Sequence, residues 1–162
     1  MTLDAGAVER LYRSHGHVVM RRARTLLGSE DDAREVLQDV FADLLHAPGA
    51  VKVPGSALAW LYQATTHRCL NQLRNRRTGL RLLDRHVAPG QATTEGPRGE
   101  ALAAVRQLLG RLPAELAEVV VYHHLDGMTQ EEISLLVGCS RRQVGYLLER
   151  AQASLQSEER TA

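Results

Sequence analysis

The sequence of 162 residues has few aromatic side chains, and this shortage narrows the choice of fold. Aromatic residues make up 4% of the chain and hydrophobic residues 44%, so a buried core must consist mainly of leucine, valine and alanine. Leucine and alanine are good helix formers, whereas no strand-like alternation of any length is present. The composition therefore favours an α-helical protein.

Cysteine is scarce as well. Cys69 and Cys139 are 70 positions apart without a CxxC spacing, which excludes a disulfide framework and a zinc ribbon and predicts reduced, partly buried thiols. His123 and His124 point to different sides of a helix and lack a third ligand, so we expect no metal and no cofactor. The sequence also lacks a nucleophile array, paired catalytic carboxylates and a phosphate-binding glycine loop. We expect a protein that is not an enzyme.

Long hydrophobic runs and an excess of one charge are missing too. No stretch approaches the roughly 18 apolar residues of a membrane span, and the N-terminus lacks the order of a signal peptide. We therefore expect a cytoplasmic chain that does not insert into a membrane. The formal net charge of +1 gives no support to a polycationic binder. Of the 20 basic residues 19 are arginine, which suits pairing with phosphates and bases but also follows from GC-rich codons.

The composition changes near the middle of the chain. Residues 79–100 collect glycine, proline and threonine without apolar periodicity, which predicts a flexible linker. The linker separates residues 1–78 from residues 101–162, and units of that size bury only about 60% of their unfolded surface. We expect each unit to be marginally stable alone.

Apolar residues recur at helical spacing in three stretches of the first unit, which predicts helices over residues 7–27, 29–47 and 56–73. Gly28 stops the first helix, and Ser29 with Asp32 forms a start that resembles a capping box. Ser56 is positioned to cap the third helix.

The second unit also has apolar residues at helical spacing, in shorter segments. Residues 114–125 form a predicted helix, and Thr129 with Glu132 is a capping box that opens a short one. After a turn that contains glycine, Ser140 with Gln143 opens a last helix. Two helices joined by such a turn are typical of a helix-turn-helix. The predicted fold is all-α, with two small helical domains joined by a flexible linker, the C-terminal one a helix-turn-helix.

The small net charge hides two strongly charged helices. Residues 29–45 carry six acidic residues against Arg34 alone, whereas residues 67–86 carry six arginines against Asp84 alone. An acidic helix cannot lie along phosphates, so the first of these either binds a basic protein surface or faces solvent.

A stripe of mixed side chains follows the third predicted helix opposite its apolar face. At spacings of 3, 4, 4 and 3 it contains Trp60, Gln63, His67, Asn71 and Arg74. Exposed bases offer rings to stack on and edges to hydrogen-bond, so this mixture favours a nucleic-acid surface. The alternative is that Trp60 belongs to the core.

Together these features resemble the small two-domain sigma factors of bacterial RNA polymerase, the extracytoplasmic-function (ECF) type of the sigma-70 family. The resemblance covers residues 11–155, and its most specific string is Gln38-Asp39-Val40-Phe41 with Asp32-Ala33 and Val36 before it. Residues 59–77 are similar to the helix that melts promoters and reads the −10 element, and residues 111–140 resemble the −35-reading domain. Residues 1–78 would then be sigma region 2 and residues 101–162 region 4. The linker would thread into the polymerase near its active centre and RNA exit path.

The resemblance implies three groups of site residues. The docking group, which would bind the clamp helices of the largest polymerase subunit, consists of Glu35, Gln38, Asp39 and Asp43. The −10 group consists of Trp60, Gln63, His67, Arg68, Asn71, Arg74, Arg76 and Arg77. The −35 group consists of Thr129, Ser140, Arg141, Arg142, Gln143, Tyr146 and Arg150.

Some positions depart from the family pattern. The family usually has Asn where this chain has His67, and Asp where it has Asn71, which predicts a different −10 base preference. Two basic residues common in the recognition helix are missing, and we expect Arg141 and Arg142 to supply phosphate and guanine contacts instead.

The partners that the resemblance implies are core RNA polymerase, through its clamp helices and flap, promoter DNA and an anti-sigma factor. Two alternatives remain. A stand-alone helix-turn-helix regulator would bind duplex DNA without polymerase, normally as a dimer. A sigma-like protein that only sequesters an anti-sigma factor would lose the arginine cluster of residues 68–85, which this chain retains.

Overall fold

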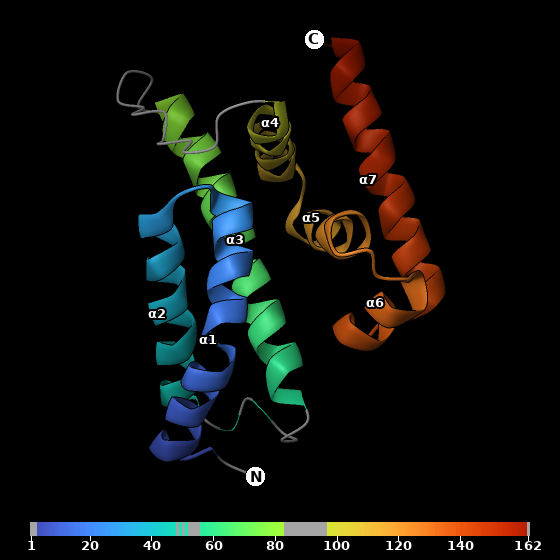
Figure 1. Cartoon of the computed structure of the whole chain (residues 1–162). Helices are drawn as coiled ribbons and strands as arrows, with labels where there is room; N and C mark the ends of the chain where they lie inside the picture. Colours follow the sequence, from blue (N-terminus) through green and yellow to red (C-terminus); the bar gives the residue numbers. More distant parts are fainter. Residues whose placement is uncertain (1–2, 48, 50, 52–55, 83–96, 162) are drawn as a thin grey trace.

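The computed structural model describes residues 3–47, 49, 51, 56–82 and 97–161, and all regular structure within these residues is helical. In chain order the elements are α1 (Ala5–Leu27), α2 (Glu30–His46), α3 (Ala57–Leu82), α4 (Pro97–Arg111), α5 (Ala114–Val120), the π-helical η3 (Val121–Leu125), α6 (Gln130–Val137) and α7 (Arg141–Thr161) (Figure 1). The all-α prediction is confirmed. Of the predicted linker, residues 83–96 lie outside the described part, and its two ends belong to α3 and α4.

The first three helices pack against one another as a bundle (Figure 1). Its buried side chains are mostly leucine, valine and alanine, as the shortage of aromatic residues predicts; they include Val19, Ala23, Leu26, Val36, Val40, Leu44, Leu61 and Leu70. Phe41 is the one phenylalanine of the chain, and it packs edge-on against Tyr12 with the ring centroids 5.2 Å apart.

Local capping sets the boundary between α1 and α2. Gly28 has a left-handed backbone with φ of 69°, and its N–H donates to the carbonyl of Arg24 at 2.8 Å. The next residue, Ser29, accepts a hydrogen bond at its hydroxyl from the N–H of Asp32 at 3.2 Å. Both predicted signals are therefore confirmed.

The helix-turn-helix of the second unit is confirmed as well. Thr129 and Glu132 form a reciprocal capping box at the start of α6, with N···O distances of 3.1 and 3.0 Å. Gly138 ends α6 with φ of 76°, and the hydroxyl of Ser140 accepts from the N–H of Gln143 at 3.0 Å to begin α7. Helix α7 packs against α6 and α5, and the buried residues of the two helices of the motif are Ile133, Val144, Leu147 and Ala151.

Helix α4 was not predicted, and it packs along α3. A Cβ atom at Gly110 would lie 3.1 Å from the carbonyl oxygen of Leu73, so this glycine permits the close approach of the two helices. Helix α5 also packs against α3, and the buried residues of both units form one continuous core. The two units therefore lie in direct contact, which the composition of the linker did not indicate. Among the described residues no helix is long and apolar enough to cross a membrane.

Candidate nucleic-acid interface

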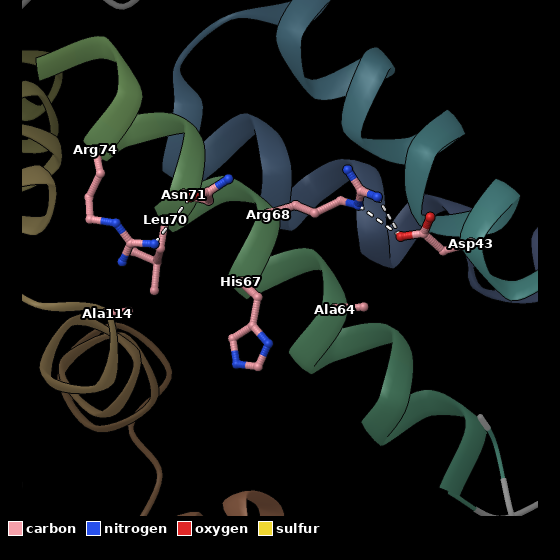
Figure 2. A pocket seen from close by; sticks show the side chains of 8 residues that line it. All are labelled: Asp43, Ala64, His67, Arg68, Leu70, Asn71, Arg74 and Ala114. Atoms are coloured by element: carbon pink, nitrogen blue, oxygen red, sulfur yellow. Dashed lines mark hydrogen bonds and ion pairs between the residues drawn. The ribbon is translucent and has the colours of Figure 1, made fainter. Parts of the chain in front are cut away.

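The predicted stripe on α3 borders a pocket of about 650 Å³. Figure 2 shows the pocket lining, which is Asp43, Ala64, His67, Arg68, Leu70, Asn71, Arg74 and Ala114. His67 and Asn71 are exposed, and Arg74 Nη2 donates to Asn71 Oδ1 at 3.2 Å. Arg74 Nη1 is buried without a hydrogen-bond partner among the described residues. The pocket thus combines an imidazole, an amide and a guanidinium that is not fully paired.

Trp60 and Gln63 lie at the N-terminal end of the stripe, and both are half-buried. The Trp60 ring packs against the apolar core while part of it stays accessible. Trp60 is therefore partly a core residue and partly a ring that a base could stack on.

Arg68 points away from His67, toward α2 (Figure 2). It forms an ion pair with Asp43 and lies 3.5 Å from a carboxylate oxygen of Asp39. An arginine of the −10 group thus neutralises two acidic residues of the docking group. Glu35 and Gln38 of that group are exposed on the same helix.

Arg76 fastens α3 to the junction between α1 and α2. Its Nη1 donates to the carbonyl of Leu27 at 2.9 Å, and its Nη2 forms an ion pair with Asp32. A cation at the C-terminus of α1 and an anion in the first turn of α2 both suit the helix dipoles. Arg77, the next residue, is half-buried.

The −35 group is divided between helix starts and an open surface. Thr129 and Ser140 are the N-caps of α6 and α7. The other members lie on the first turns of α7 and are exposed: Arg141, Arg142, Gln143, Tyr146 and Arg150. A second pocket of about 550 Å³ borders Arg142, Gln143 and Tyr146.

Arg150 and Tyr146 interact within α7. The guanidinium of Arg150 lies 5.7 Å from the ring centroid of Tyr146, and its Nη1 lies 3.6 Å from Glu115 Oε1 on α5. The arginine thus has an internal anionic partner on a neighbouring helix.

A buried polar cluster that sequence reasoning missed joins the two units. Arg22 of α1 is only 8% exposed and forms an ion pair with Asp126, the residue after η3. Its guanidinium carbon lies 4.3 Å from the ring centroid of Tyr62, and that ring stacks at 6.0 Å on Tyr122 of η3. We call these four residues the clasp. In the sequence, this cluster was indicated only by the position of Arg22 on the apolar face of the helix predicted over residues 7–27.

Burial changes the titration of the tyrosines in the clasp. It raises the pKa of Tyr62 to about 12, assisted by a hydrogen bond to Asp126, and it also raises the pKa of Tyr122. Both phenols therefore stay neutral at physiological pH.

A second polar contact between the units joins His67 of α3 to Glu118 of α5. Burial raises the pKa of Glu118, and the charge of His67 opposes this effect. His67 therefore lies at the pocket and at the contact between units.

The family models divide along the same line as the two units. The model of sigma-70 region 2 matches residues 11–78, and that of sigma-70 region 4 matches residues 102–155. The chain is 30% identical over 161 residues to the RNA polymerase sigma factor CnrH of Cupriavidus metallidurans, an alignment that covers 92% of this chain and 84% of CnrH. It is 26% identical over 152 residues to the ECF RNA polymerase sigma factor SigM of Mycobacterium tuberculosis, covering 94% and 76%.

Solved structures show the same fold. CnrH in complex with the cytosolic domain of CnrY matches with a TM-score of 0.56 and 24% identity, covering 98% of this chain and 90% of that one. RpoE in complex with the anti-sigma factor NepR, from Bartonella quintana, matches with a TM-score of 0.55 and 19% identity, covering 92% and 94%. With both family regions present, the chain belongs to the ECF sigma factors of the sigma-70 family, which are transcription initiation factors.

Proposed function

We propose that this sigma factor binds core RNA polymerase in the cytoplasm and directs promoter-specific initiation, without a catalytic group of its own. Residues 1–78 dock on the polymerase and read and melt the −10 element, and residues 101–162 read the −35 element. The observation that carries the proposal is the presence, in one chain, of the α3 pocket beside His67 and of an exposed recognition helix α7.

The pocket on α3 suits a single unstacked base of the −10 element. The exposed side chains of His67 and Asn71 offer donors and acceptors to a base edge, and Arg74 places a guanidinium beside them. Stacking on an aromatic ring such as Trp60 is worth about 1–3 kcal/mol per base. Opening DNA costs about 1.4 kcal/mol per base-pair step, so such contacts offset only one or two steps. Melting a longer bubble therefore requires binding energy from the polymerase.

The acidic face of α2 suits the polymerase clamp. Docking on a basic surface would compete with Arg68 for Asp39 and Asp43 and would release the guanidinium for DNA phosphate. Exposed ion pairs contribute only about 0–1 kcal/mol, so the exchange costs little. Polymerase docking and −10 binding would thus support each other.

The first turns of α7 suit the major groove of the −35 element. Arg141, Arg142 and Gln143 are exposed beside the N-terminal amides of the helix, where bases and phosphates are commonly contacted. Thr129 and Ser140 contribute by fixing the starts of α6 and α7. Tyr146, Arg150, Arg76 and Arg77 are proposed to contact the DNA backbone.

Two further partners are proposed from the relatives. The polymerase flap would hold residues 101–162 while residues 79–100 pass near the active centre. An anti-sigma factor would hold the free chain, since RpoE has been solved in complex with one.

A reconstituted run-off assay tests the proposed function. Core polymerase with this chain should transcribe a small subset of genomic fragments that core polymerase alone does not. Replacing Arg141 and Arg142 together by Ala should lower transcription about tenfold, since a bidentate base contact contributes about 1–3 kcal/mol. The control Arg13→Ala, on an exposed arginine of α1, should leave transcription unchanged.

Two outcomes would contradict this assignment. Transcription from no genomic fragment, or tight duplex binding by the chain alone in a gel shift, would argue against a sigma factor. If the double Ala substitution lowered transcription by the same factor from promoters with an intact and with a scrambled −35 element, Arg141 and Arg142 would be phosphate contacts without a role in base recognition.

A further inference from the structure

The guanidinium of Arg74 has a different kind of partner from those of two other arginines on α3. Arg68 and Arg76 form ion pairs with carboxylates of α2. Arg74 Nη2 donates instead to the side-chain oxygen of Asn71, which is exposed and lies three positions earlier on α3, at 3.2 Å. Both residues of this contact belong to one helix, so the contact does not require another element of the fold.

This hydrogen bond determines which end of the Asn71 amide is left for a ligand. A guanidinium has only donors, so the amide must turn its carbonyl oxygen toward Arg74. The amide nitrogen then points away from Arg74, as Figure 2 shows. Because Asn71 lines the pocket on α3, the part of its side chain that remains for a base is the NH2 group, which only donates.

The groups around Asn71 reinforce this donor character. A hydrogen bond from the cationic Arg74 polarises the amide and strengthens donation by the NH2 group at its other end. Asp43, the carboxylate that lines the same pocket, already accepts from Arg68. The imidazole of His67 is able to donate or to accept and so suits either kind of base edge. The pocket therefore offers a base mainly donors.

The four bases differ in the group that they would place opposite such a donor. Thymine has a carbonyl oxygen at O4 and guanine has one at O6, whereas cytosine and adenine have an amino group at N4 and N6. A carbonyl oxygen accepts from the amide NH2. An amino group would meet it donor to donor and leave both groups without a partner, which is costly where water is excluded.

We propose that Asn71, oriented by Arg74, selects a keto base, thymine or guanine, over an amino base at the −10 position that enters the α3 pocket. Asn71 is the residue that determines specificity, and Arg74 is a positioning residue that acts through the orientation of the amide. The inference rests on the proposed function and deepens it, because it names the chemical class of base that the pocket accepts.

A promoter library tests the proposal with core polymerase and the full chain. It starts from a fragment that this chain transcribes and places each of the four bases at every position of the −10 element. At one position, templates with T or G on the nontemplate strand should be transcribed about fivefold or more better than those with C or A. Asn71→Asp should invert the preference at that position, because a carboxylate only accepts.

Asn75→Asp is the matched control for this inversion. It makes the same change of charge at an exposed asparagine one turn further along α3, and it should keep the base profile of the wild type. Circular dichroism should show the same helix content in all variants.

Arg74→Met tests the positioning role, since it removes the donor and keeps an unbranched apolar stem. The Asn71 amide is then free to turn, so the ratio of transcription from keto and amino templates should fall toward one, whatever uniform loss a missing phosphate contact adds. In NMR spectra of the free chain, the side-chain NH2 signals of Asn71 should shift in this variant. Those of Gln63, about three turns earlier on α3, should stay unchanged.

Several results would overturn the inference. Absence of a keto preference at every −10 position, which the wild-type chain alone decides, would exclude it, as would an Asn71→Asp profile identical to that of the wild type. A keto preference that persists in Arg74→Met, or NH2 signals of Asn71 that do not move, would exclude the role of Arg74. If no fragment is transcribed at all, the proposed function fails and the base preference with it, whereas the NMR spectra still decide whether Arg74 orients Asn71.

Discussion

Two glycines share a left-handed backbone and differ in their surroundings. Gly28 and Gly127 have φ of 69° and 68°. A Cβ at Gly28 would lie 2.6 Å from the guanidinium carbon of Arg106, which donates to the carbonyl of Thr25 at 3.2 and 3.1 Å. Among the described residues, apart from its chain neighbours, no atom would lie within 4 Å of a Cβ at Gly127. The two positions therefore separate the cost of backbone strain from the cost of a displaced contact between units.

We expect Gly127→Ala to lower the free energy of unfolding by about 1 kcal/mol, because a non-glycine residue is strained in this conformation. Gly28→Ala should lower it further, since Arg106 must also move. Urea unfolding followed by circular dichroism measures both values.

An Arg106→Ala background provides the control. There the two glycine substitutions should have nearly equal effects, because only the backbone strain remains. Equal effects in the wild-type background would show that the Arg106 contact places no constraint on Gly28.

Single-residue roles were predictable only in part. Helical spacing correctly brought His67, Asn71 and Arg74 to one pocket. It could not show that Arg68 pairs with residues 25 and 29 positions earlier, or that Arg76 reaches a carbonyl 49 positions earlier. Spacing along the sequence determines which residues share a helix face. Which other helix that face contacts is determined by tertiary packing.

At the scale of elements, helix boundaries were the most predictable feature, because caps depend on residues three or four positions apart. Ser29, Thr129 and Ser140 each begin a helix as predicted. Helix α4 was missed because its first residues continue a stretch rich in proline and glycine. Its packing depends on the long-range approach of Gly110 to Leu73, which no local signal carries.

The capping box of α6 should make this helix sensitive to acid. Hydrogen bonds from Thr129 lower the pKa of Glu132 below its ordinary value of 4.5. A carboxyl whose pKa is lowered by folding contributes stability above its unfolded pKa, and the contribution is lost as the pH falls through the folded pKa. In an NMR titration, Glu132 should therefore titrate at lower pH in the native chain than in urea.

Glu132→Gln is the control for this effect. In this variant, the protection of the amides at the start of α6 against hydrogen exchange should no longer decrease as the pH falls. A Glu132 midpoint that is the same in the native and unfolded chains would contradict a role for its charge in the cap.

At the scale of the whole molecule, opposite charges that sum to the small net charge also pair with one another inside the fold. The acidic helix α2 and the basic helix α3 are neighbours, and Arg68 and Arg76 neutralise carboxylates of α2. The two charged helices were predictable from the sequence, but their mutual pairing was not. With so little uncompensated charge, the free chain should bind duplex DNA only weakly.

The continuous core predicts that the chain unfolds as one unit. Trp60 is the only tryptophan and lies in α3, so its fluorescence follows the first unit, whereas circular dichroism follows the helices of both. In urea the two signals should change together, because α4 and α5 pack against α3. Separated midpoints would show that the units unfold independently.

The π-helical turn η3 gives this chain an unusual sensitivity to length. The N–H of Asp126 donates to the carbonyl of Val121 at 3.1 Å, five residues earlier, so the turn accommodates one residue more than an α-helical turn would. Deleting one residue between positions 121 and 125 would restore α-helical pairing and rotate the following residues by about 100°. Asp126 would then face away from Arg22, and the helix-turn-helix would leave its present orientation. Substitutions in this turn leave the register intact, whereas an insertion or a deletion reorients the helix-turn-helix of α6 and α7 relative to the rest of the chain.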